Sequence, residues 1–158
     1  MEVRQFTPRD VDQIARLFHD TVRQVNSCDY SEQQTQAWAP DDLYFRDWAA
    51  VCANRYTYVA DDGGKIAGFA ELEPNGHIDC FYCHKQYQRH GVGKQLYQAI
   101  EAKAVELNLL RLFVESSITA QPFFQRMGFS VVQEQQVFYR GESFVNFKME
   151  KWLTMMNP

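Results

Sequence analysis

The feature that most constrains the fold of this chain is a glycine-containing stretch at the start of its longest predicted helix. Residues 88–100 read QRHGVGKQLYQAI, and Gly91 and Gly93 stand where an extended run passes into an amphipathic helix. The first turn of a helix leaves backbone N–H groups unpaired, and the helix dipole adds about half a positive charge there. Glycine lets an anion approach those groups without a Cβ in the way. The stretch therefore predicts an anion-binding helix start.

Two nucleotide-binding motifs place glycines in a similar way, and the sequence excludes both. A Walker A loop needs a glycine at position 88 and Ser or Thr after the lysine, but these positions hold Gln88 and Gln95. A dinucleotide-binding fingerprint needs a third glycine where Leu96 stands, within a parallel βαβ unit. The strand predicted before Gly91 belongs instead to an antiparallel meander.

The rest of the sequence predicts a mixed α/β (α+β) chain. Strand-like runs occupy residues 3–6, 56–60, 65–73, 77–84, 111–115, 129–138 and 143–151, and helix patterns occupy residues 8–25, 32–39, 41–53, 92–108 and 120–127. The chain has no linker, internal repeat or low-complexity segment. Residues 1–158 are therefore predicted to form a single domain.

The element order and three local motifs resemble the GNAT superfamily of N-acetyltransferases. Gln88-x-x-Gly91-x-Gly93 is similar to the acyl-CoA pyrophosphate loop of that superfamily. Residues 117–129, which end in Gly-Phe, are typical of its fifth strand and the following helix, and residues 61–69 of its second hairpin. The resemblance covers nearly the whole chain. It implies a GNAT fold with one mixed, mostly antiparallel sheet of six to seven strands and helices on both faces.

The resemblance also implies that the chain takes acetyl-CoA as acyl donor. In the superfamily the fourth strand splays from its neighbour, so backbone groups near Phe81 and Cys83 are expected to pair with the pantetheine amides. Positive side chains around the glycine loop are expected to face the phosphates of CoA. The candidate acetyl-CoA-binding residues are Phe81, Tyr82, Cys83, Gln88, Arg89, His90, Gly91, Val92, Gly93, Lys94, Ser117 and Phe124.

Acetyl transfer to an amine needs a base, because a free alkylamine has a pKa near about 10.4. Asp79 is the first candidate, since a carboxylate in an apolar and aromatic strand is destabilising unless something uses it. A structural hydrogen bond is the competing interpretation of Asp79. His77 is the second candidate because histidine ordinarily titrates near about pH 6.5, and a solvated strand start is the competing interpretation of it. Glu71 and Glu73 are weaker alternatives on the neighbouring strand.

Two residues depart from the superfamily pattern. Phe124 stands where a tyrosine often protonates the departing thiolate, and Ser117 stands where an asparagine often contacts CoA. Tyr82, Tyr87 and Tyr139 are the candidate replacement acids. These departures keep open a second class of function, a non-catalytic acyl-CoA-binding sensor or regulatory domain.

The expected reaction is direct transfer of an acetyl group to a primary amine, without an acyl-enzyme. The expected acceptor is a small molecule, and a protein N-terminus or lysine is the alternative. Tyr30 and Trp38 flank a helix-capping box and could cover the acceptor. The sequence is also compatible with a homodimer.

Composition and cysteine placement exclude other classes of function. A formal net charge of −4 gives no electrostatic reason to bind nucleic acid or anionic lipid. No apolar run approaches the roughly 18–20 residues that cross a bilayer, and no secretory segment is recognisable, so a cytoplasmic location is expected. Cys80 and Cys83 lie within one strand with thiols on opposite faces, and Cys28 and Cys52 are isolated. Neither a metal site nor a redox pair is expected.

Overall fold

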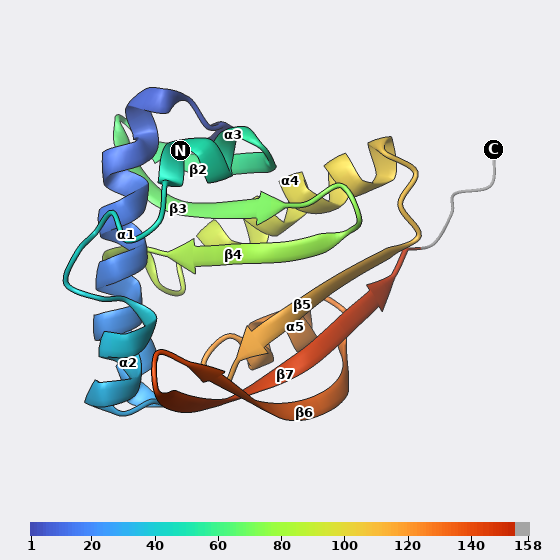
Figure 1. Cartoon of the computed structure of the whole chain (residues 1–158). Helices are drawn as coiled ribbons and strands as arrows, with labels where there is room; N and C mark the ends of the chain where they lie inside the picture. The colour runs from blue at the N-terminus through green and yellow to red at the C-terminus, as the bar shows by residue number, and fades with distance from the viewer. Residues whose placement is uncertain (154–158) are drawn as a thin grey trace.

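The computed structural model describes residues 1–153, so the last five residues of the predicted 1–158 domain lie outside the described residues. The chain forms one seven-stranded sheet in the order β1-β2-β3-β4-β5-β7-β6 (Figure 1). The strands are β1 (Glu2–Gln5), β2 (Tyr56–Asp62), β3 (Lys65–Leu72), β4 (His77–Cys83), β5 (Arg111–Ser117), β6 (Ser130–Tyr139) and β7 (Glu142–Trp152). All neighbouring strands are antiparallel except β4 and β5, which confirms the predicted mixed, mostly antiparallel sheet.

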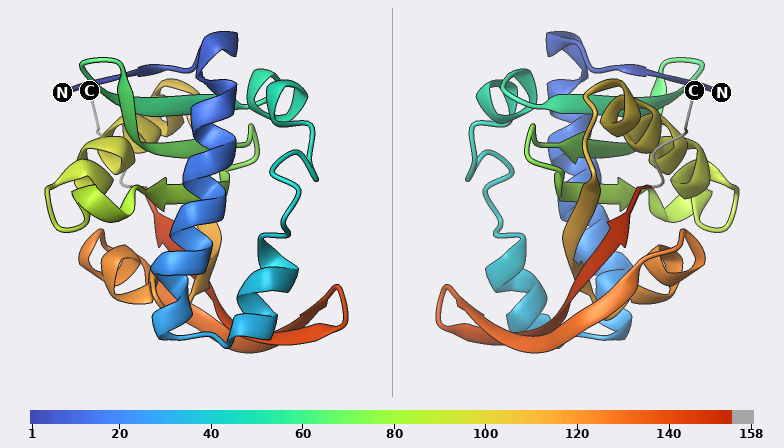
Figure 2. Two further views of the ribbon diagram at one scale, coloured as in Figure 1. Left: turned by 90° about the vertical axis from the view of Figure 1, so that its left-hand side faces the viewer. Right: turned by 90° about the vertical axis from the view of Figure 1, so that its right-hand side faces the viewer.

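Helices cover both faces of the sheet, as predicted. They are α1 (Val11–Gln24), α2 (Glu32–Trp38), α3 (Trp48–Ala53), α4 (Val92–Glu106) and α5 (Gln121–Arg126), with short 3-10 turns at Pro8–Asp10, Asn26–Cys28 and Lys85–Tyr87. The apolar residues of α1 and α3 form one buried cluster with Phe69 of β3. Those of α4 and α5 form a second cluster with Leu72 and Ile78. Figure 2 shows α1 and α4 on opposite sides of the sheet.

The sheet divides between β4 and β5. These strands pair only at His77 with Phe113 and Ile78 with Val114, and from Asp79 onward they diverge (Figure 1). The register between β3 and β4 also shifts between Ala70 and Leu72, which is the signature of a β-bulge. The divergence leaves one side of β4 without a strand partner at the centre of the molecule.

The helix predicted over residues 41–53 is wrong in its first half, because only Trp48–Ala53 is helical. Asp42 accepts a hydrogen bond from the backbone N–H of Tyr44 at 3.0 Å, which forms a local turn instead of a helical one. Asp47 then accepts from the N–H of Ala50 at 3.2 Å and begins α3. Short acidic side chains compete with the helix in this way when they bond their own backbone.

Among residues 1–153, no helix is long and apolar enough to cross a membrane.

Candidate active site

A cleft of about 860 Å³ opens where β4 and β5 diverge. Its walls come from β4, the loop after it, the first turn of α4, the end of β5 and α5. All the predicted acetyl-CoA-binding residues line this cleft except His90, which is exposed outside it. The structure therefore places nine residues of the stretch 81–94 in one cleft together with Ser117 and Phe124.

Gly91 and Gly93 both line the cleft, but only at Gly91 is the space around the Cβ position empty. Gly91 caps the helix with φ 78°, in the left-handed region, and a Cβ built there would meet nothing within 4 Å. A Cβ on Gly93 would lie 3.0 Å from the ring of Phe123 on α5. Gly91 thus leaves its backbone accessible to an anion. Gly93 lets α4 and α5 pack closely.

Within residues 1–153, β4 has no strand partner on the side of β5 from Asp79 onward, but the backbone carbonyl of Cys83 is already hydrogen-bonded by side chains. The carbonyl oxygen of Cys83 accepts hydrogen bonds from Nε2 of Gln88 at 2.7 Å and from Oγ1 of Thr21 at 3.2 Å. Burial raises the pKa of the Cys83 thiol to about 12, so this thiol is neutral at physiological pH. It is therefore a poor nucleophile, which agrees with transfer without an acyl-enzyme.

The two residues that depart from the superfamily pattern have mainly structural contacts. Phe124 is 1% exposed, and its ring packs against Phe81, Phe123 and Phe129 with centroid separations of 5.2–5.5 Å. Ser117 Oγ accepts a hydrogen bond from the N–H of Ala120 at 3.0 Å, just before α5. Both residues line the cleft. Phe124 has no hydroxyl and the hydroxyl of Ser117 is not acidic, so neither replaces the tyrosine as a proton donor.

A second cavity of about 330 Å³ adjoins the cleft. Residues that line both spaces are Trp38, Asp79, Tyr82, Glu115 and Ser117. The rest of the second lining is Phe18, Tyr30, Phe45, Arg46, Cys80, Val137, Phe138, Tyr139, Phe144 and Asn146. The two cavities therefore meet at a group of polar side chains that contains the predicted catalytic residues Asp79 and Tyr82.

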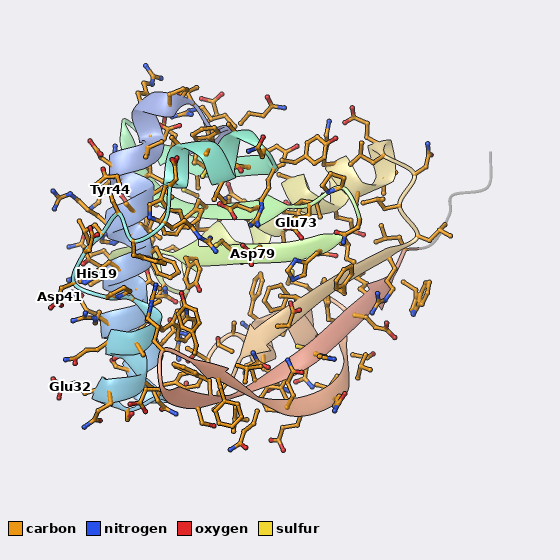
Figure 3. The ribbon with its side chains drawn as sticks, in the orientation of Figure 1. His19, Glu32, Asp41, Tyr44, Glu73 and Asp79 are labelled. Atoms are coloured by element: carbon orange, nitrogen blue, oxygen red, sulfur yellow. The ribbon has the colours of Figure 1, made fainter. Side chains whose placement is uncertain are left out.

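Asp79 lies at this junction within a network of ion pairs. Arg55 contacts Asp79 through Nη1, and Arg46 approaches the same carboxylate at 3.5 Å. Arg55 also pairs with the fully buried Glu71 and with Glu73, both at 2.9 Å. Figure 3 labels Glu73 and Asp79, which follow β3 and lie on β4 respectively. Burial and the nearby Asp79 charge raise the pKa of Glu71. The ion pairs of Asp79 are compatible with a structural role, and its position at the cavity junction is compatible with a role as general base.

His77 lies beside the junction and is held between two carboxylates. Its Nδ1 is 2.7 Å from Oε2 of Glu73, and its Nε2 is 2.5 Å from Oε2 of Glu115. The hydrogen bond to Glu115 is the main reason that the pKa of His77 rises to about 9. His77 is therefore cationic at neutral pH and holds Glu115 in place, which disfavours it as a base there.

The candidate acids are at different places. Tyr82 lies at the junction, and burial raises the pKa of its hydroxyl well above the ordinary value, so the hydroxyl keeps its proton. Tyr87 lines the cleft, but its hydroxyl donates to Asp62 at 2.6 Å. Tyr139 lines only the second cavity. Of the three hydroxyls, only that of Tyr82 belongs to a residue that borders both cavities.

Glu71, Asp79 and Cys80 form a group whose oxygen and sulfur atoms lie within 4.8 Å of one another. Two arginines occupy the same space, since Arg55 pairs with both carboxylates and Nη1 of Arg46 lies 3.4 Å from the sulfur of Cys80. The negative charge of the group is therefore balanced by guanidinium groups, and its donors do not fit a metal ion.

Sequence reasoning missed Glu115, Arg46 and Arg55 as members of the site. Glu115 precedes Ser117 by two residues on a strand, so the two side chains share a face, and this spacing was a usable signal. The arginines gave no local signal, because their carboxylate partners lie on other elements.

Comparison with known proteins identifies the family. The family model of the acetyltransferase (GNAT) domain matches residues 26–151. The chain belongs to this family. It is 34% identical over 149 residues to the uncharacterized N-acetyltransferase YafP of Escherichia coli strain K12, across 94% of each chain.

Solved structures agree with this assignment. A GCN5-related N-acetyltransferase from Rhodopseudomonas palustris is 34% identical and has a TM-score of 0.89, with 96% of this chain and 95% of that chain covered. The PaiA N-acetyltransferase of Thermoplasma acidophilum, solved in complex with coenzyme A, shares the fold with a TM-score of 0.79 at 16% identity, over 96% and 98% of the two chains. The predicted GNAT fold and acetyltransferase activity are confirmed.

Proposed function

We propose that this acetyltransferase transfers an acetyl group from acetyl-CoA directly to the primary amine of a small molecule. The observation that carries the proposal is the meeting of the two cavities at Asp79, Tyr82 and Glu115. The larger cleft suits an extended donor, and the smaller cavity suits a compact acceptor. Their junction is where the two substrates would react.

The residues of the cleft fit acetyl-CoA. The open N–H groups at Gly91 and the nearby positive side chains of Arg89, Lys94 and Arg126 suit a pyrophosphate, because a helix N-terminus and cations both stabilise anions. The unpaired side of β4 suits the amides of the pantetheine arm. The coenzyme A complex of the Thermoplasma protein, which has the same fold, supports the same donor.

The chemistry follows from the groups at the junction. The amine nitrogen attacks the thioester carbonyl carbon, a C–N bond forms and the C–S bond breaks. Asp79 accepts the proton that the amine loses, directly or through a water. Tyr82, the one candidate acid that borders both cavities, supplies a proton from its hydroxyl to the departing thiolate. Neither Cys80 nor Cys83 acts as a nucleophile, because burial raises the pKa of both thiols.

Release of free CoA thiol in the presence of a panel of primary amines tests this function. At least one small amine should accelerate release, and Asp79→Asn should lower kcat about 100-fold while the Kd for acetyl-CoA stays within about twofold. Asp41→Asn is the control, since the Asp41 side chain is 98% exposed and lies outside both linings.

Two outcomes would replace the proposal. Tight acetyl-CoA binding with no thiol release for any amine would assign the chain as an acyl-CoA sensor, a function favoured by the absent hydroxyl at Phe124. Turnover with peptide N-termini or lysines but not with small amines would identify a protein acceptor.

A further inference from the structure

We propose that the acceptor is a compact amine with one positive charge on a flat, aromatic body. This inference rests on the proposed function and concerns the second cavity, which we call the acceptor pocket and which is lined by the residues given above. Its shape, its aromatic walls and the placement of its charges each restrict the acceptor.

The walls of the acceptor pocket are predominantly aromatic. Trp38 stands between Tyr30, Tyr82 and Phe144, with ring centroids 5.5, 6.4 and 6.1 Å away. These rings meet edge to face, which is a favoured packing of aromatic side chains. Phe138 also lines the pocket and is 78% exposed, which places it at the mouth. Such walls bind a flat apolar body by stacking.

The charges of the pocket are separated along its length. Asp79 and Glu115 line both the pocket and the acetyl-CoA cleft, so they mark the inner end. The guanidinium of Arg140 lies 4.9 Å from the ring centroid of Phe45 and 4.5 Å from that of Tyr139, so it stands over two residues of the lining and close along the chain to Phe138 at the mouth. The ion-pair network at the inner end contains four carboxylates (Glu71, Glu73, Asp79 and Glu115) and three cations (Arg46, Arg55 and His77), so it accommodates one further ammonium group. A second cationic group on the same molecule would meet Arg140.

Two elements that line the pocket, α2 and the β6–β7 hairpin, are hydrogen-bonded to each other. Arg140 in the β6–β7 turn donates to the carbonyl of Ala37 at 2.8 Å, and Gln34 of α2 donates to the carbonyl of Ser143 at 2.6 Å. These bonds tie the hairpin to α2, and Figure 2 shows the two elements side by side. A volume of about 330 Å³ is at the lower end for ligand sites. These features favour a small molecule over a peptide.

The test compares amines that differ in one property, with the full-length protein and acetyl-CoA. The kcat/KM for 2-phenylethylamine should exceed that for n-butylamine and for 2-cyclohexylethylamine at least tenfold, because stacking needs a flat body. It should also exceed that for 4-(2-aminoethyl)benzylamine at least tenfold, because this diamine adds a second charge to the same body. Spermidine and an alanyl peptide should be poorer still.

Two variants test which residues cause the predicted preferences among amines. Arg140→Gln should raise the kcat/KM ratio of the diamine to 2-phenylethylamine at least threefold, since glutamine keeps a donor for Ala37 and removes the charge. Phe138→Ser should raise KM for 2-phenylethylamine more than for n-butylamine. Arg16→Gln, an exposed position on α1 outside both linings, should leave every ratio unchanged.

The outcomes separate this inference from the proposed function. A preference for spermidine, for the diamine or for aliphatic monoamines would overturn the aromatic monocation while acetyl transfer stands. An unchanged diamine ratio in Arg140→Gln would overturn the role given to the charge of Arg140. No thiol release with any amine would overturn the proposed function and this inference with it.

Discussion

The imidazole of His77 links two carboxylates on different parts of the sheet, and its protonation contributes to stability. Its pKa rises from an ordinary value of 6.5 to about 9 in the folded protein, first because Glu115 accepts a hydrogen bond from it. A raised pKa in the folded state means that the folded protein holds a proton that the unfolded chain releases above about pH 6.5. The stabilisation is complete below that pH and is lost as the pH rises through 9.

The prediction at this scale is a pH-dependent difference between the wild type and His77→Gln. At pH 6 the variant should have a free energy of unfolding lower by about 2 kcal/mol, less than the full shift because Glu115 is partly exposed and screened. The difference should shrink to near zero above about pH 9.5. Urea unfolding at several pH values measures it. A difference that stays constant over this range would contradict the ion-paired state of His77.

The residues at the site differ in how far the sequence predicts them. Asp79 stands out in the sequence because a carboxylate is unexpected in an apolar strand, and that signal needs only neighbouring residues. Arg55 and Glu115 acquire their roles from contacts with β3 and β4, which form only after the chain has folded. The site is therefore predictable where one strand defines it and not where several elements meet.

At the scale of elements, the start of α4 determines whether the cleft accepts an anion. Gly91→Val should weaken acetyl-CoA binding at least tenfold, because the side chain would cover the exposed N–H groups and valine resists the left-handed φ of 78°. The fold should survive with a loss of about 1–2 kcal/mol from the backbone strain. Calorimetric titration with acetyl-CoA measures the affinity.

The matched control for this prediction is Gly63→Val. Gly63 also has a positive φ, 62°, and open space around its Cβ position, but it lies in the β2–β3 turn outside both linings. The Gly63→Val variant should lose a similar amount of stability and keep the affinity of the wild type for acetyl-CoA. Equal affinities in the two variants would show that the start of α4 does not bind the phosphates.

Elements whose determinants are local were predicted correctly. The β6–β7 hairpin and α4 follow from alternation, helical spacing and turn residues, and α2 from the capping box at Ser31. The prediction of a helix from residue 41 was wrong, although the apolar residues there have helical spacing, because the aspartates favour turns. Local backbone bonding by Asp42 outweighed periodicity there. The resemblance, and not periodicity, supplied the splay between β4 and β5.

At the scale of the molecule, the divergence of β4 and β5 separates the sheet into two parts. Strands β1 to β4 and strands β5 to β7 share only two paired positions. The cleft needs this separation, so other contacts must hold the parts together. Tyr30 follows α1, which packs against β3 and β4 of the first part, and it lies between the end of β5 and β7 of the second part. Its hydroxyl accepts from the N–H of Ile118 at 2.9 Å and donates to the carbonyl of Val145 at 2.6 Å.

Tyr30→Phe should therefore lower the free energy of unfolding by about 2 kcal/mol, since it keeps the ring but leaves two backbone groups without a partner. For a chain of this size, the melting temperature should fall by roughly 4–8 °C. Tyr139→Phe is the control, because that residue is 42% exposed and surface substitutions usually stay within about 0.5 kcal/mol. Thermal and urea unfolding of both variants, without acetyl-CoA, gives the comparison. If Tyr30→Phe were as stable as the control, the hydrogen bonds of Tyr30 would not contribute to holding the two parts of the sheet together.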